Sequence, residues 1–225
     1  MRRLVVAVLV GLTLLTGCTS NSVSDGFEGG SFVFVSPGGK SEFTYPAAER
    51  QTIGNFTGSS VVDENVTLSL DTYPDLVMVL NFWGSWCAPC RAEAPDLNVA
   101  AELSAERGVQ FLGINVQDTR QGAADFMAGK QVSFPSIFDP TMRTILSMQG
   151  YPTGSIPSTI VLDRQHRVAH IFLGAVGAQQ LDAVLAAVAA ESPAPASSSP
   201  AAGSATSAGT PATAESSAPG TTSSP

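Results

Sequence analysis

A short apolar run that leads directly into a pair of cysteines constrains this chain more than any other stretch. Residues 76–80 (Leu-Val-Met-Val-Leu) are continuously apolar, and such a run between turn residues is typical of a buried strand in a parallel or mixed sheet. A Gly-Ser pair breaks the strand, and Cys87 and Cys90 follow. Residues 91–94 are good helix formers. The sequence therefore places two cysteines where a buried strand is followed by the N-terminus of a helix.

The two cysteines are expected to differ in reactivity. Unpaired N–H groups and a partial positive charge at a helix N-terminus stabilise a thiolate, so Cys87 is predicted to be the attacking sulfur. Cys90 lies one turn further along, where it is expected to be less exposed and to resolve the mixed disulfide. A static disulfide is one alternative, but a bridge across two residues would constrain almost nothing. A zinc site is another, but its remaining ligands would be His166 and His170, which are spaced across a turn.

The segment from Phe82 to Cys90, Phe-Trp-Gly-Ser-Trp-Cys-Ala-Pro-Cys, resembles the active site of the thioredoxin superfamily. It is most similar to extracytoplasmic thioredoxin-like lipoproteins, the redoxin or TlpA-ResA-like family, which are related to the cytochrome c biogenesis thioredoxins. Pro95 corresponds to the proline that kinks the first helix of the superfamily. The resemblance extends over residues 50–190 and implies an α/β thioredoxin fold, with a central mixed β-sheet flanked by helices.

The resemblance also assigns residues around the cysteines. Cytoplasmic thioredoxins carry a buried aspartate at the position of Asn81, whereas the extracytoplasmic group shares a glutamate three residues after the second cysteine, here Glu93. On a helix, Glu93 lies one turn from Cys90, and burial would raise the pKa of its carboxyl group enough for proton exchange with that thiol. A solvated helix carboxylate is the alternative. Trp86 is implied to be part of the substrate-binding surface.

Pro157 directly precedes the apolar strand predicted at residues 159–162. Base rates alone favour a trans bond before a proline. The resemblance instead implies a cis Ile156–Pro157 bond that packs against the cysteines and belongs to the catalytic site, and the competing Pro152 lies further from the strand. A cis bond here would leave the backbone of Ile156 free to pair with an extended substrate.

The rest of the chain alternates strand and helix signals, which favours a layered α/β architecture. A β-hairpin extension is expected before the first core strand, between residues 52 and 70. Asp139 and Pro140 are expected to start a helix as its cap and first residue, and His166 and His170 are expected at the surface. Asp118 or Thr119 is expected to cap a helix that continues to about Gly129. The other predicted elements are a strand at 109–116, an extended segment at 133–138, strands at 159–162 and 168–173, and a helix at 179–190.

Both ends of the chain differ in composition from the predicted domain at residues 31–190. Residues 1–18 combine two arginines with a short apolar segment and end in Leu-Thr-Gly-Cys, which resembles a bacterial lipobox and implies lipidation of Cys18. An ordinary signal peptide with an incidental cysteine is the alternative. Residues 19–30 are expected to be a tether. Residues 191–225 are rich in Ala, Ser, Pro and Thr and are expected to be disordered.

Charge and cysteine usage narrow the function. The net charge is −8, and Lys and Arg do not cluster beyond residue 3, so a nucleic-acid partner is not expected. The resemblance implies a monomeric thiol-disulfide oxidoreductase without cofactor or metal, lipid-anchored on the extracytoplasmic face of the bacterial cell membrane. A binding or chaperone module that keeps the shape without turnover is the competing class. A peroxiredoxin is disfavoured because the upstream Pro and Thr pattern is missing.

The sequence does not determine the direction of electron flow, because small changes in reduction potential decide it. Segments 31–40, 134–139 and 156–163 look most like cytochrome c biogenesis thioredoxins of high-GC Gram-positive bacteria. This implies a reductant that opens the disulfide between the haem-binding cysteines of apocytochrome c, with a membrane thiol transporter as its electron donor. The alternative is a general extracytoplasmic disulfide oxidase or isomerase for secreted proteins.

Overall fold

The computed structural model describes residues 27–35 and 38–191. The predicted signal segment with Cys18, most of the predicted tether and all but the first residue of the predicted tail lie outside the described residues. Among the residues described, no helix combines the length and the apolar character needed to cross a membrane.

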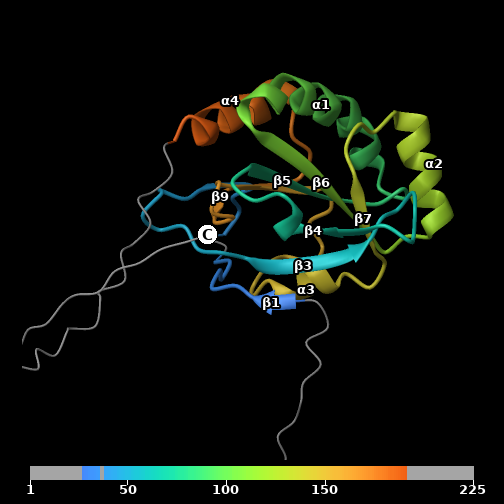
Figure 1. Cartoon of the computed structure of the whole chain (residues 1–225), viewed down its shortest axis with the longest axis horizontal. Coiled ribbons are helices and arrows are strands. Elements are labelled where there is room, and N and C mark those ends of the chain that lie inside the picture. Colours follow the sequence, from blue (N-terminus) through green and yellow to red (C-terminus); the bar gives the residue numbers. More distant parts are fainter. Residues whose placement is uncertain (1–26, 36–37, 192–225) are drawn as a thin grey trace, which may run out of the picture. The chain divides into compact units, whose positions relative to one another are not determined.

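A six-stranded mixed sheet forms the centre of the described domain (Figure 1). In their order across the sheet, the strands are β2 (Glu42–Thr44), β9 (Val168–Leu173), β8 (Ser158–Leu162), β5 (Val77–Trp83), β6 (Val109–Val116) and β7 (Ser136–Asp139). The parallel pairs are β5 with β6 and β6 with β7. The antiparallel pairs are β5 with β8, β8 with β9 and β9 with β2. The predicted mixed sheet is confirmed, and β6 and β9 have the predicted bounds.

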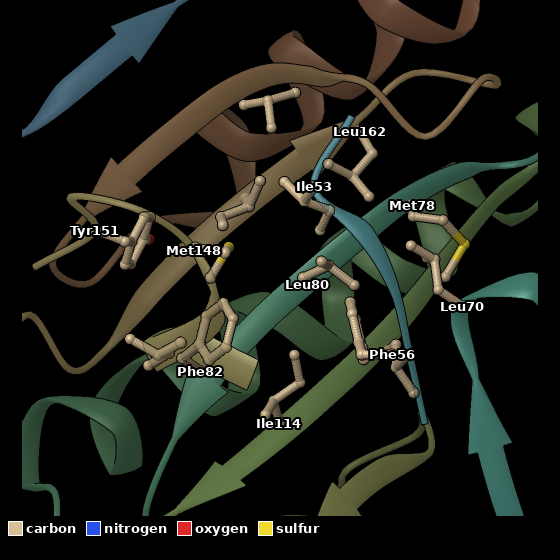
Figure 2. Packing of buried hydrophobic residues seen from close by; sticks show 14 of the residues in the cluster. Ile53, Phe56, Leu70, Met78, Leu80, Phe82, Ile114, Met148, Tyr151 and Leu162 are labelled. Atoms are coloured by element: carbon tan, nitrogen blue, oxygen red, sulfur yellow. The ribbon is translucent and has the colours of Figure 1, made fainter. Parts of the chain in front are cut away.

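The central strand β5 is buried on both faces along its whole length. Because successive side chains of a strand point to opposite faces, Val77 and Val79 pack with α1 (Ala88–Ser104) and α4 (Ala178–Ala189) on one face. Leu80 and Phe82 point to the other face, where α3 (Arg143–Ser147) and a second, smaller sheet cover them. Figure 2 shows these two side chains packed in one layer with Ile114 of β6 and Phe56 of the smaller sheet.

The smaller sheet contains the predicted N-terminal hairpin and one strand more. Its order is β1 (Phe27–Gly29), β3 (Gly54–Ser59) and β4 (Thr67–Ser69), all antiparallel. Since β1 lies within the predicted tether of residues 19–30, the predicted boundary at residue 31 is too late. The chain is already part of the domain here because β1 pairs with β3. Directly after β1 the two backbones are so close that a Cβ atom on Gly30 would lie 2.2 Å from the backbone of Ile53. This pairing is long-range, and three residues carry too little pattern to predict it.

The helix predicted from Pro140 begins later, at Arg143. Met142 has a left-handed backbone (φ 60°) immediately before it, so residues 140–142 form a turn. Asp139 still has the predicted capping role in part, because its carboxylate accepts hydrogen bonds from the backbone N–H groups of Arg143 and Thr144, both at 2.9 Å. By contrast, α2 (Arg120–Lys130) is capped by Thr119, one of the two predicted cap residues.

The prediction that His170 lies at the surface is wrong. His170 lies on β9 and is 4% exposed. Its ring faces the neighbouring edge strand β2, 3.0 Å from Thr44 Oγ1 and 3.0 Å from Glu42 Oε1. Burial lowers the pKa of His170, while the neighbouring Glu42 carboxylate acts in the opposite direction. The sequence of β9 predicts which of its side chains share a face. It does not predict that β2 pairs with β9 and brings Glu42 beside His170.

Candidate active site

Cys87 and Cys90 form a disulfide at the N-terminus of α1, with an S–S distance of 2.03 Å. Cys87 is the N-cap residue of the helix, and its Sγ accepts a hydrogen bond from the backbone N–H of Cys90 at 3.1 Å. Pro89 lies in the first turn, where a missing N–H costs no helical hydrogen bond. As predicted, a buried strand is followed by a helix, and the first cysteine is the N-cap residue of that helix.

Burial does not distinguish the two sulfurs in the way the sequence predicts. Cys87 is 3% exposed and Cys90 is 2% exposed, so the expected difference in exposure is absent from the disulfide form. Val61 of the N-terminal extension and Trp83 of β5 pack in the same cluster as both cysteines. The two cysteines differ in that the Cys87 sulfur accepts a hydrogen bond from an N–H group at the helix N-terminus.

Glu93 lies on α1 one turn after Cys90 and is 3% exposed. Its Oε1 accepts a hydrogen bond from Asn81 Nδ2 at 3.0 Å, and its Oε2 accepts one from the backbone N–H of Val176 at 3.2 Å. Burial raises the pKa of the Glu93 carboxyl group to about 7, although these two hydrogen bonds act in the opposite direction. The alternative of a solvated helix carboxylate is therefore wrong.

Asn81 connects the buried carboxyl group to the surroundings of the second cysteine. The Asn81 Nδ2 group also donates to Thr159 Oγ1 at 3.1 Å. A small, mostly apolar cavity is lined by Asn81, Cys90 and Ala94, among others. Glu93, Asn81 and Cys90 therefore form one buried group between β5 and α1, and sequence reasoning had identified Asn81 only as a departure from cytoplasmic thioredoxins.

The Ile156–Pro157 peptide bond is cis, as the resemblance implies. Pro157 is buried, and the half-buried Ile156 packs against the cluster that contains the two cysteines. Within the described residues, no hydrogen bond engages the backbone N–H or C=O of Ile156. A backbone segment with free polar groups thus lies beside the disulfide.

Trp86 is 49% exposed, the only large side chain of the active-site loop that reaches the surface. Its indole Nε1–H donates to the backbone carbonyl of Val116 at 3.1 Å. This hydrogen bond holds an aromatic surface immediately before Cys87.

Within the described residues, no group of three or more His, Cys, Asp or Glu side chains could hold a metal ion.

Sequence reasoning missed the part played by Asp118, which it considered only as a possible helix cap. The Asp118 carboxylate accepts hydrogen bonds from the backbone N–H of Ser85 at 2.6 Å and from Ser85 Oγ at 2.8 Å. The available signal was its position just after β6, because functional residues gather at the carboxyl ends of parallel strands. Asp118 joins two loops of the site that are distant in sequence.

Comparison with known proteins identifies sequence relatives of this chain. The Redoxin family profile matches residues 48–185. The thiol-disulfide oxidoreductase ResA of Geobacillus kaustophilus (strain HTA426) is 28% identical over 113 residues, which make up 50% of this chain and 63% of that protein. The chain thus matches less than two thirds of the length of this relative.

Two solved structures are more similar in sequence. A secreted thiol-disulfide isomerase from Corynebacterium glutamicum is 42% identical, with a TM-score of 0.69 over 72% of this chain and 100% of that chain. A DsbF homologue from Corynebacterium diphtheriae is 41% identical, with a TM-score of 0.66 over 69% of this chain and 98% of that chain.

The raised pKa of Glu93 predicts how stability changes with pH. An unfolded glutamate titrates near 4.5, whereas folded Glu93 titrates near 7. The folded state therefore holds the proton more tightly, and its stability falls by about 3 kcal/mol as the pH rises through this interval. In Glu93→Gln this loss should disappear, as measured by urea unfolding of the oxidised protein between pH 4.5 and 7.5.

Glu102→Gln is the matched control, because Glu102 lies on the same helix and is exposed. This variant should keep the pH dependence of the original protein. An unchanged pH dependence in Glu93→Gln would contradict the raised pKa.

Proposed function

Since the chain belongs to the Redoxin family and has the thioredoxin fold predicted from its sequence, we propose that it is a thiol-disulfide oxidoreductase acting on protein substrates. The observation that carries the proposal is the disulfide between Cys87 and Cys90 at the N-terminus of α1, beside the cis Ile156–Pro157 bond. A disulfide across two residues adds little to stability, so its place at a helix N-terminus favours redox exchange. No cofactor is needed for this chemistry.

The reaction in the reducing direction has two exchange steps. The Cys87 thiolate attacks one sulfur of a substrate disulfide, forms a mixed disulfide and releases the other substrate sulfur as a thiolate. The Cys90 thiolate then attacks Cys87 Sγ, which closes the Cys87–Cys90 disulfide and releases the second substrate sulfur. Two electrons pass to the substrate. An external dithiol must then reduce the enzyme, and in the oxidising direction every step runs backwards.

Glu93 is proposed to accept the proton of Cys90 when the second step begins. The support is the buried position of Glu93 one turn from Cys90, and the pKa of about 7 that burial gives its carboxyl group. A group with a pKa near the working pH both accepts and returns a proton at low cost. Asn81 orients the carboxyl group through its 3.0 Å hydrogen bond.

The proposed substrate contact combines Trp86 and Ile156. Trp86 offers an exposed aromatic face on the residue before Cys87, and the backbone of Ile156 offers a donor and an acceptor to an extended polypeptide. Backbone pairing recognises a chain without selecting its sequence, so the contact suits unfolded protein segments that carry disulfides.

Within this activity, we favour reduction of the haem-binding cysteines of apocytochrome c, with a membrane thiol transporter as electron donor. The similarity to ResA proteins and the buried Glu93 support this role. The second candidate is a general disulfide isomerase or oxidase for secreted proteins. Its support is the 42% identity to the secreted thiol-disulfide isomerase of Corynebacterium glutamicum.

We propose an extracytoplasmic location, which is supported by the 42% identity to a secreted thiol-disulfide isomerase. We propose that Cys18 is the lipid-bearing residue that anchors the protein to the cell membrane. This assignment also leaves two cysteines for the redox pair, out of three in the chain.

The roles within the cysteine pair can be separated by substitution. Cys87→Ser should abolish the acceleration by the protein of insulin reduction with dithiothreitol, because the attacking sulfur is lost. Cys90→Ser should accumulate mixed disulfides with substrate, seen as bands that disappear on reduction. If Cys87→Ser accumulated them instead, the two roles would be reversed. A wild-type protein without activity in this assay would favour a binding or chaperone module.

The proposed role in cytochrome c maturation can be tested by measuring covalently bound haem in cells. A strain without this gene should lose c-type cytochromes that stain for haem after denaturing electrophoresis, and wild-type protein but not Cys87→Ser should restore them. Free cysteine thiols are required because haem attaches through thioether bonds. Normal cytochromes together with missing disulfides in secreted proteins would instead support the isomerase or oxidase.

The lipid anchor has a direct chemical test. Metabolically labelled palmitate should accompany the protein into the membrane fraction, and Cys18→Ser should abolish both the label and the membrane association, since the lipid is attached to that sulfur. Label retained on the Cys18→Ser protein would disprove the assignment.

A further inference from the structure

Ser85, two residues before the first cysteine, is held by charged side chains on both sides of its backbone. Its N–H donates to Asp118 Oδ2 at 2.6 Å, and its hydroxyl group donates to Asp118 Oδ1 at 2.8 Å. Its carbonyl accepts a hydrogen bond from the guanidinium of Arg91 on α1. Hydrogen bonds to charged groups are about twice as strong as neutral ones, and three of them hold Ser85 in the loop.

Each oxygen of the Asp118 carboxylate accepts two hydrogen bonds. Besides the two bonds from Ser85, it accepts hydrogen bonds from Asn115 Nδ2 at 2.9 Å and from the backbone N–H of Thr119 at 2.8 Å. It does not cap α2, because Thr119 is the N-cap residue of that helix. Burial tends to raise the pKa of Asp118, but the hydrogen bonds outweigh it and lower the pKa below its usual value. The charged carboxylate form of Asp118 is therefore favoured.

The two loops approach closely where Asp118 meets Ser85. A Cβ atom on Gly122 would lie 3.1 Å from Ser85 Oγ and 3.2 Å from Asp118 Oδ1, which is tighter than ordinary contact. A second connection runs from Trp86 Nε1 to the carbonyl of Val116. Two successive residues of the loop after β5, Ser85 and Trp86, are thus attached to the loop after β6 and to the last residue of β6.

The attached loop determines where the first sulfur lies. The backbone N–H of Cys87 donates to the carbonyl of Gly84 at 3.1 Å, so Ser85 and Trp86 form the turn that leads into α1. Cys87 then has the extended backbone of an N-cap residue (φ −83°, ψ 111°), which directs its Sγ to the N–H of Cys90. Because this N–H stabilises a thiolate more than a disulfide sulfur, any loosening of the turn disfavours the reduced form.

We propose that Asp118 is a positioning residue for the redox reaction, which acts through Ser85 to keep the Cys87 sulfur on the N-terminus of α1. The proposal rests on the proposed thiol-disulfide exchange. It extends that function by giving a residue from a different loop control over the reactivity of Cys87 and over the balance between disulfide and dithiol.

The test compares Asp118→Ala and Asp118→Asn with the original full-length protein. After reduction and removal of the reductant, each protein is alkylated with iodoacetamide at pH 7, and peptide mass spectrometry follows Cys87, Cys90 and Cys18 separately. Asp118→Ala should slow alkylation of Cys87 by roughly threefold to tenfold, an effect comparable to losing one helix-cap interaction. In glutathione buffers, the equilibrium of both variants should move toward the disulfide.

Asp125→Ala is the matched control, because Asp125 is an exposed carboxylate on α2 whose side chain bonds Gln121 instead of the active-site loop. It changes the net charge by the same amount and should behave as the original protein in both measurements. Ser85→Ala removes the hydroxyl bond and keeps the backbone bond, so its effect should have the same direction and be smaller.

Unchanged alkylation of Cys87 and an unchanged glutathione equilibrium in Asp118→Ala would overturn the proposal. If Asp118→Ala does not fold, Asp118→Asn decides by the same criteria, because it preserves the shape and loses acceptor capacity. Neither measurement needs a protein substrate, so a wild-type protein that fails to reduce insulin would disprove the proposed function without deciding the role of Asp118.

Discussion

The burial of β5 on both faces is the constraint on which the rest of the structure depends. All seven residues of the strand are buried, so its direction and its end point are determined by packing against α1 and α4 on one face and the smaller sheet on the other. Its last residues carry Asn81 and Trp83 into the interior next to the cysteines. Because β5 is held on both faces, the position of Cys87 at the start of α1 is restricted.

Two carboxyl groups near the cysteines have opposite environments. Glu93 is buried with only two hydrogen bonds, so desolvation dominates and its pKa rises to about 7. Asp118 is partly exposed and accepts four hydrogen bonds, so its charged form is favoured and its pKa falls. The difference matches the two proposed roles, since a proton carrier must titrate near the working pH and a structural acceptor must remain charged.

The N-terminal extension contributes to the redox site as well as to the core. Arg120 of α2 donates hydrogen bonds to the carbonyls of Ser60 and Val61, and its guanidinium lies 4.4 Å from the centre of the Phe138 ring. These contacts hold Val61 in the cluster that covers both cysteines. The burial of Cys87 in the disulfide form therefore depends on a segment that precedes the catalytic strand in sequence.

Local patterns in the sequence determined the strand at 109–116, the strand at 168–173 and the cysteine pair at a helix start, because each depends on neighbours within a few residues. Tertiary structure decided the rest. The hydrogen bonds of Ser85 to Asp118, of Val176 to Glu93 and of His170 to Glu42 join residues 33, 83 and 128 positions apart. Sequence periodicity carries no information on such pairings. Only the folded chain buries Glu93, which raises the pKa of its carboxyl group to about 7, and gives the partly exposed Asp118 the hydrogen bonds that lower its pKa.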